Sequence, residues 1–155
     1  MIVTLSPSNI LDFDSEISTT ISSEPRFSKE ANELNELMKK MSVEDIASLM
    51  KINPSLAQST YEYIHTYDMS KVPTRQAALA YNGIAYQGLE ADTLSAEDLE
   101  FAQDHLVILS GLYGMLRPLD RIKPYRLELQ TKLKNKRGAS LYDYWRETLT
   151  KQLGQ

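Results

Sequence analysis

The chain has 155 residues, 42% of them hydrophobic and 25% charged, with a formal net charge of −4. This length and composition are typical of a soluble globular protein, and we expect residues 1–155 to form a single domain. The absence of cysteine excludes disulfides, thiolate metal sites and cysteine nucleophiles. No apolar run approaches the roughly 18 residues of a membrane span, and the N-terminus lacks the pattern of a signal peptide. We therefore expect a cytoplasmic protein without a membrane partner.

The N-terminal half is expected to contain a strand, a loop and three helices. Residues 1–5 are apolar and β-branched and end at a Ser-Pro turn, which predicts a strand. Ser6 and Asn9 follow this strand, at the position where open α/β sheets place ligand groups. Residues 12–27 are polar and predict a surface loop. The three helices are expected to begin at Ser28, at a capping box over Ser42–Asp45, and at Asn53-Pro54, with Leu34, Leu37, Met38, Met41, Ile46, Leu49, Met50, Leu56, Tyr63 and Ile64 facing inward.

The C-terminal half is expected to alternate strands and helices. Residues 77–81 and 84–86 predict two short strands joined by an Asn82-Gly83 hairpin or loop signal. The later elements are expected to be a helix over 96–105 capped by Ser95, a buried strand over 106–109, a strand over 127–133 and a closing helix over 140–153. Together these elements predict an α/β (α+β) fold, with a mixed sheet and surrounding helices.

Residues 110–128, SGLYGMLRPLDRIKPYRLE, combine glycines, prolines, tyrosines and cations in a pattern that fits neither a helix nor a strand. They open the one strongly basic part of an acidic chain, because residues 111–138 hold eight Lys or Arg against two Asp or Glu. Such a stretch favours an anionic ligand, although a solvated charged face is the alternative, particularly for residues 132–137. The stretch is either a binding loop or a packed connection whose glycines and prolines set turns.

The chemistry of these residues suits anions better than catalysis. Arginine offers a planar fork to phosphate or carboxylate, glycine lets backbone N–H groups approach a phosphate, and tyrosine can stack on a base. The glycines match neither the P-loop nor the dinucleotide-binding pattern. His65 and His105 lie near predicted helix ends and lack metal-ligand spacing, so no metal or cofactor is predicted.

These same residues resemble the YaaA family (UPF0246), together with SPSNILD at 6–12, YNGIAYQGL at 81–89 and LYDYW at 141–145. The resemblance implies a bacterial peroxide-stress protein that limits free iron and oxidative damage. It implies a "cantaloupe" α/β fold with a basic cleft and a helix-hairpin-helix-like element, here LSGLYGMLRP at 109–118, and binding to DNA. The expected anion-binding residues are Ser6, Asn9, Ser110, Gly111, Tyr113, Gly114, Arg117, Arg121, Tyr125 and Arg126, with Asp120 and Glu128 as structural support.

The chain also departs from the pattern of this family. Asn9 and Asn82 stand where lysines are usual, Ile84 where an acid is usual, and Gln130 where glycine is usual. Family chains are longer, so we expect this chain to be the N-terminal part of a longer YaaA-like domain. Two alternatives to DNA binding remain open. One is an enzyme that clamps a small anionic or nucleotide-like substrate with Arg117 and Arg126, and the other is an inactive remnant. The sequence predicts no oligomeric state.

Overall fold

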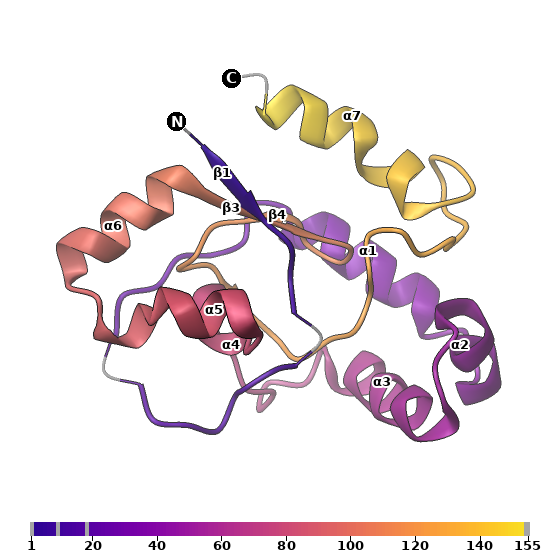
Figure 1. Ribbon diagram of the computed structural model, residues 1–155. Coiled ribbons are helices and arrows are strands. Elements are labelled where there is room, and N and C mark those ends of the chain that lie inside the picture. Colours follow the sequence, from indigo (N-terminus) through magenta and orange to yellow (C-terminus); the bar gives the residue numbers. More distant parts are fainter. Residues whose placement is uncertain (1, 9, 18, 154–155) are drawn as a thin grey trace. The chain divides into compact units, whose positions relative to one another are not determined.

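The computed structural model describes residues 2–8, 10–17 and 19–153 and has the mixed α/β fold that the sequence predicts (Figure 1). The strands are β1 (Val3–Leu5), β2 (Arg75–Gln76), β3 (Leu106–Ser110), β4 (Gly114–Leu116) and β5 (Arg121–Ile122). The helices are α1 (Ser28–Met38), α2 (Val43–Met50), α3 (Pro54–Thr66), α4 (Ala77–Ala80), α5 (Ile84–Leu89), the 3-10 helix η1 (Ala91–Thr93), α6 (Ala96–His105) and α7 (Leu141–Leu153). No helix in these ranges is long and apolar enough to cross a membrane.

The chain divides into two compact units, which are described separately. Unit 1 comprises Met1–Arg26, Lys71–Leu109 and Met115–Pro124, and unit 2 comprises Phe27–Ser70, Ser110–Gly114 and Tyr125–Gln155. The expectation that residues 1–155 belong to a single, longer domain stays a prediction.

Unit 1 is built on a three-stranded sheet in the order β1-β3-β4. β1 runs parallel to β3, with Val3 opposite Leu106 and Leu5 opposite Ile108. Only three residues separate β3 from β4, which is too short for a parallel crossover, so β4 runs antiparallel to β3. The strand predicted within 1–5 is confirmed as Val3–Leu5, and the strand over 106–109 is confirmed as β3. The helix over 96–105 is confirmed with Ser95 as its cap.

The predicted strands over residues 77–81 and 84–86 are wrong, because these residues form two short helices, α4 and α5. Alanine is the strongest helix former, and the AALA sequence of α4 lacks the alternation of a half-buried strand. Gly83 is the N-cap residue of α5 and not part of a hairpin turn. The nearby strand is β2, which pairs antiparallel with β5 and precedes α4 directly.

Unit 2 contains α1, α2, α3 and α7, and most of its predicted helix ends are confirmed. The Ser42–Asp45 capping box forms with both of its hydrogen bonds, and the Asn53 side chain caps α3. α1 begins at Ser28 as predicted, and Phe27 occupies the cap position before it without a side-chain bond. Leu56 was expected to face inward but is 37% exposed. The buried face of α3 instead carries Ala57, Thr60 and Ile64.

The predicted strand over 127–133 is also wrong, because these residues are irregular. Leu127, Thr131 and Leu133 are nevertheless buried, which accounts for the apolar positions in the sequence. The predicted closing helix is confirmed as α7, drawn in yellow in Figure 1. The Tyr144 hydroxyl donates to Glu33 of α1 over 2.7 Å, and the Trp145 ring lies 5.7 Å from that of Phe27. These contacts hold α7 against the start and middle of α1.

Candidate functional site

The stretch over 110–128 is divided between the two units. Ser110–Gly114 and Tyr125–Glu128 belong to unit 2, whereas Met115–Pro124 belongs to unit 1. The predicted site residues are therefore described unit by unit.

The glycine-bearing turn of unit 2 is packed tightly against its neighbours. The Gly111 carbonyl oxygen accepts a 2.8 Å hydrogen bond from the indole Nε1 of Trp145. A Cβ on Gly111 would lie 2.2 Å from the Leu127 carbonyl oxygen, and a Cβ on Gly114 would lie 2.6 Å from the Trp145 ring. Close packing therefore requires both glycines. The turn joins the two strands β3 and β4, so 109–118 is not a hairpin between two helices as the resemblance implied. The buried apolar residues of 106–109 favour a strand before this turn.

Ser110, Tyr113 and Tyr125 form a hydroxyl cluster in unit 2. The Ser110 Oγ lies 2.7 Å from the Tyr125 hydroxyl and accepts the backbone N–H of Tyr113 over 3.1 Å. The Tyr67 hydroxyl lies 3.3 Å from that of Tyr113, and burial raises the pKa of Tyr67. Tyr113 is only 2% exposed, and its ring meets that of Tyr125 edge to face. A ring this buried has no face on which a base can stack.

Asp120 and Arg117 form an ion pair in unit 1, with a buried carboxylate and a half-buried guanidinium. The Asp120 carboxylate is 0% exposed and accepts from the Arg117 backbone N–H (2.8 Å), Arg117 Nε (3.1 Å) and Ser23 Oγ (2.6 Å). Arg117 Nη2 also donates to the Glu24 carbonyl oxygen over 3.1 Å. These bonds fix the guanidinium within the unit, because a buried carboxylate that lost its cationic partner would be strongly destabilising.

Arg121 and Ser6 are the other candidate binding residues that the structure describes in unit 1. Arg121 is exposed on β5, and its Nε and Nη2 donate to the Thr74 hydroxyl over 3.0 and 2.6 Å. The Ser6 carbonyl oxygen accepts from the Tyr86 hydroxyl over 2.6 Å, so its backbone helps to anchor α5. Asn9 lies outside the described residues.

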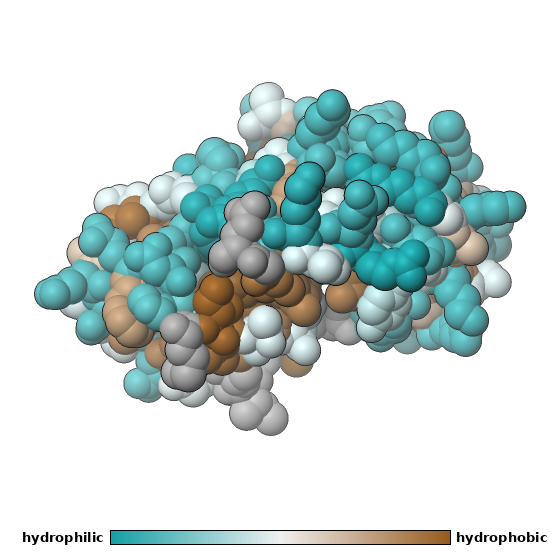
Figure 2. Space-filling view, turned by 90° about the horizontal axis from the view of Figure 1, so that it is seen from above, coloured by the Kyte–Doolittle hydropathy of each residue, from teal (hydrophilic) through white to brown (hydrophobic). Residues whose placement is uncertain are grey.

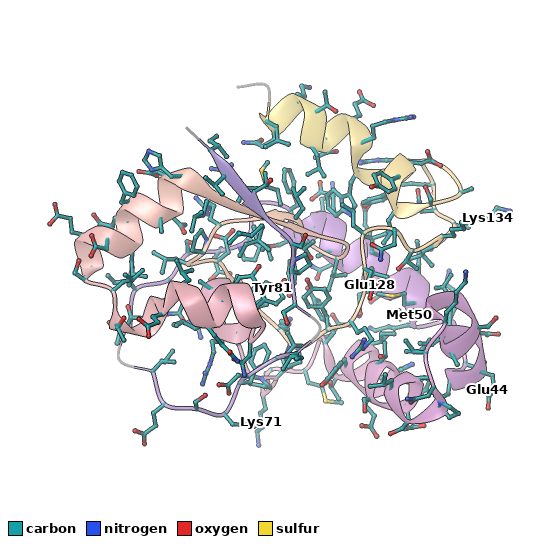
Figure 3. The ribbon with its side chains drawn as sticks, viewed as in Figure 1. Glu44, Met50, Lys71, Tyr81, Glu128 and Lys134 are labelled. Atoms are coloured by element: carbon teal, nitrogen blue, oxygen red, sulfur yellow. The ribbon has the colours of Figure 1, made fainter. Side chains whose placement is uncertain are left out.

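A basic loop between Thr131 and Ser140 was counted in the charge balance but not among the predicted site residues. Its exposed cations are Lys132, Lys134, Lys136 and Arg137. Thr131 and Leu133 alternate with the first two of these and are buried, so the lysines on either side of Leu133 face outward. Figure 3 shows Lys134 extending away from the ribbon. The clustering of Lys and Arg in the sequence was the signal that could have identified this loop.

The backbone of the basic loop is held in place by its own side chains. Asn135 Nδ2 donates to the carbonyl oxygens of Leu133 and Ser140, and Asn135 and Gly138 are paired through their backbones. Arg137 Nη1 donates to the Tyr144 carbonyl oxygen over 2.9 Å, and its guanidinium lies 4.6 Å from the Tyr144 ring centre. Lys136 pairs with Glu33 over 3.0 Å. Lys132 and Lys134 thus project from an ordered loop.

Two predicted site residues lie close to this loop in sequence. Arg126, an expected anion contact, is half-buried, and Glu128, expected as structural support, accepts from the Gln130 side chain. Unit 2 as a whole carries 11 Lys and Arg against 10 Asp and Glu, whereas unit 1 carries 6 against 11. The acidity of the chain is therefore concentrated in unit 1. Within the described residues, no three His, Asp or Glu side chains are grouped closely enough to hold a metal ion.

Comparison of the amino-acid sequence with known proteins identifies the family of this chain. The family model described as "Peroxide stress protein YaaA" matches residues 1–155. A UPF0246 protein of Bordetella pertussis is 44% identical to this chain over its full length, and the match covers 61% of the Bordetella protein. A UPF0246 protein of Maricaulis maris is also 44% identical, over 99% of this chain and 58% of its own length. A UPF0246 protein of Burkholderia ambifaria is 42% identical, with 60% of its length covered. The chain thus spans about 60% of the length of these curated relatives. This chain belongs to the YaaA family of peroxide stress proteins.

Proposed function

We propose that this protein serves in the peroxide stress response by binding the phosphate backbone of DNA, and that the basic loop provides the principal contact. The observation that supports this proposal is the projection of Lys132 and Lys134 from a loop whose backbone is held by Asn135. Exposed lysines are point charges that displace counterions from a phosphate backbone without reading bases. The expected binding is therefore independent of DNA sequence and strongly dependent on salt.

The glycine turn is less suited to this contact than the sequence suggested. Phosphate binding by backbone N–H groups requires a turn that a phosphate can approach, whereas Gly111 and Gly114 are buried against Leu127 and Trp145. Arg117 is committed to the buried Asp120 carboxylate. The proposed function therefore assigns Gly111, Gly114 and Arg117 to maintaining the fold, and assigns the phosphate contacts to exposed cations.

The test is the affinity of a fluorescein-labelled 20-base-pair duplex, measured by anisotropy as a function of KCl concentration. The double variant Lys132→Gln/Lys134→Gln is expected to bind more weakly on every duplex sequence tested. The slope of log K against log salt concentration is negative, and its magnitude should decrease by about 1.8, because each phosphate contact contributes about 0.9. Inorganic pyrophosphate as a competitor distinguishes DNA from a small anionic ligand, which pyrophosphate would displace at low concentration.

The matched control is Lys40→Gln/Lys51→Gln, which removes two exposed lysines of the same unit from outside the loop. If both double variants change the affinity and the slope equally, the loop has no special role and the proposed contact is wrong. Absence of measurable duplex binding by the unchanged chain at about 50 mM salt would contradict DNA binding itself.

A further inference from the structure

We propose that unit 1 contains a binding pocket for a small amphiphilic cation, that is, a molecule with an apolar body and a protonated amine. The pocket has a volume of about 540 Å³, within the roughly 300–1,000 Å³ range of small-molecule sites. Residues from β1, α6 and the start of β3 contribute to its walls, and the lining residues that the structure describes all belong to unit 1. The basic loop belongs to unit 2 and contributes no lining residue to this pocket.

The body of the ligand follows from the walls of the pocket. Val3 of β1 and its register partner Leu106 of β3 line it together with Leu94 and Phe101. Phe101 is 65% exposed and Val3 is 41% exposed, which is high for large apolar side chains. Covering such surface gains about 25 cal/mol per Å² of apolar area removed from water. An alkyl or aromatic body is therefore the part of a ligand that these walls favour.

The charge of the ligand follows from the two polar side chains among the described lining residues, Asp98 and His105. His105 Nδ1 lies 2.7 Å from the Phe101 carbonyl oxygen, which can only accept a hydrogen bond, so Nδ1 carries the proton. In the neutral ring, Nε2 is then an acceptor. Asp98 uses its backbone N–H, not its carboxylate, in the Ser95 cap. Both polar groups of the pocket therefore present acceptors, and a ligand must supply the donor.

The surroundings favour a positive donor over a neutral one. α6 also carries Glu97, Glu100 and Asp104, and unit 1 has 11 acids against 6 cations. The Phe101 ring, stacked on His105 with centroids 4.0 Å apart, offers an aromatic face to a cation. A carboxylate or phosphate headgroup would meet like charge at this site. Because the pocket offers apolar walls and acceptors in an acidic unit, the matching ligand is an amphiphilic amine.

The experiment compares octylamine, octan-1-ol and octanoate, which share one chain length and differ in headgroup. Binding to the full chain is measured by chemical-shift changes in ¹H–¹⁵N spectra at pH 8, where histidine is ordinarily neutral. Octylamine is expected to bind at least about tenfold more tightly than octanoate, with shifts concentrated on β1 and α6. Asp98→Asn should weaken octylamine binding by about tenfold, which corresponds to a charge-assisted hydrogen bond of about 1.4 kcal/mol.

The matched control is Glu97→Gln, which removes the same charge from the same helical turn but does not line the pocket. Both variants lose a similar interaction with the helix dipole, so their melting temperatures should agree. Equal affinities for octylamine and octanoate would overturn the proposal. Equal weakening of octylamine binding by Asp98→Asn and Glu97→Gln would overturn the proposal by showing a general electrostatic effect of the helix. Absence of octylamine binding below its aggregation concentration would also overturn the proposal.

Discussion

Gly114 shows how much a single residue decides in this fold. Its φ of +73° lies in the left-handed region, where side chains with a Cβ are strained, and the Trp145 ring occupies the space of that Cβ. Gly111 lacks a positive φ but is equally constrained, by the carbonyl oxygen of Leu127. Packing around Trp145 thus explains the glycines that first suggested an anion-binding turn.

Gly114→Ala is expected to lower the free energy of unfolding by about 2–4 kcal/mol, through backbone strain and overpacking against Trp145. Urea unfolding followed by Trp145 fluorescence measures the effect. Gly88→Ala is the control, since an added Cβ there would meet no atom within 4 Å beyond the adjacent helix backbone, and alanine favours the α5 helix. It should be neutral or stabilising by up to about 1 kcal/mol. A smaller loss for Gly114→Ala than for Gly88→Ala would contradict this account.

Residue type alone did not indicate which way the side chains of the basic stretch point. Ser110 and Tyr113 have the hydroxyls and ring that a nucleic-acid contact uses, yet both are buried in the Tyr67–Tyr125 cluster. Lys132 and Lys134 were identified only by charge, and their alternation with buried Thr131 and Leu133 orients them outward. Burial depends on what packs from distant parts of the chain, which residue chemistry does not encode locally.

At the level of elements, helix starts were the most predictable features. The capping box at Ser42 and the caps at Asn53 and Ser95 each involve groups only three residues apart. Such contacts depend on local sequence and need no tertiary partner. The short segments 77–86 and 127–133 were mispredicted because neither has a period long enough to separate helix, strand and irregular structure.

Ser42→Ala is expected to destabilise the protein by about 1 kcal/mol, because the Asp45 backbone N–H loses its acceptor at the start of α2. Ser59→Ala is the matched control. Ser59 is half-buried inside α3, and its hydroxyl donates to the Ser55 carbonyl oxygen four residues earlier. Alanine there should be neutral or slightly stabilising. Equal unfolding midpoints in urea for the two variants would show that the Ser42–Asp45 capping box contributes nothing to stability.

For the whole molecule, the stability at low pH should depend on the hydrogen bond between Glu33 and Tyr144. This bond lowers the pKa of Glu33 below its ordinary 4.5, and the hydrogen bond from Lys136 lowers it further by a smaller amount. Burial raises the pKa of Tyr144. Because the folded-state pKa of Glu33 is depressed, its contribution is complete above about pH 4.5 and is lost as the pH falls through the folded value. Acid should therefore loosen the α1–α7 contact.

Tyr144→Phe is expected to cost about 1 kcal/mol at neutral pH, where it removes a hydrogen bond to a charged but partly exposed group. It should also make stability fall less steeply between about pH 5 and 3, because Glu33 then titrates nearer its ordinary value. Thermal unfolding across this pH range measures both effects. Tyr142→Phe is the control, since Tyr142 is exposed on the same helix. Parallel stability–pH curves for the unchanged protein and Tyr144→Phe would contradict the proposed coupling.

The sequence by itself determined the family, the α/β class, the helix caps and the clustering of positive charge. Each depends on residue identity, or on contacts between residues a few positions apart. Only the tertiary structure decided that 110–128 is divided between two units, that Tyr113 and Asp120 are buried, and that Trp145 fills the space beside Gly114. These outcomes depend on packing between segments distant in sequence. That packing buries the hydroxyls and glycines first proposed for binding and leaves the lysines of the basic loop exposed.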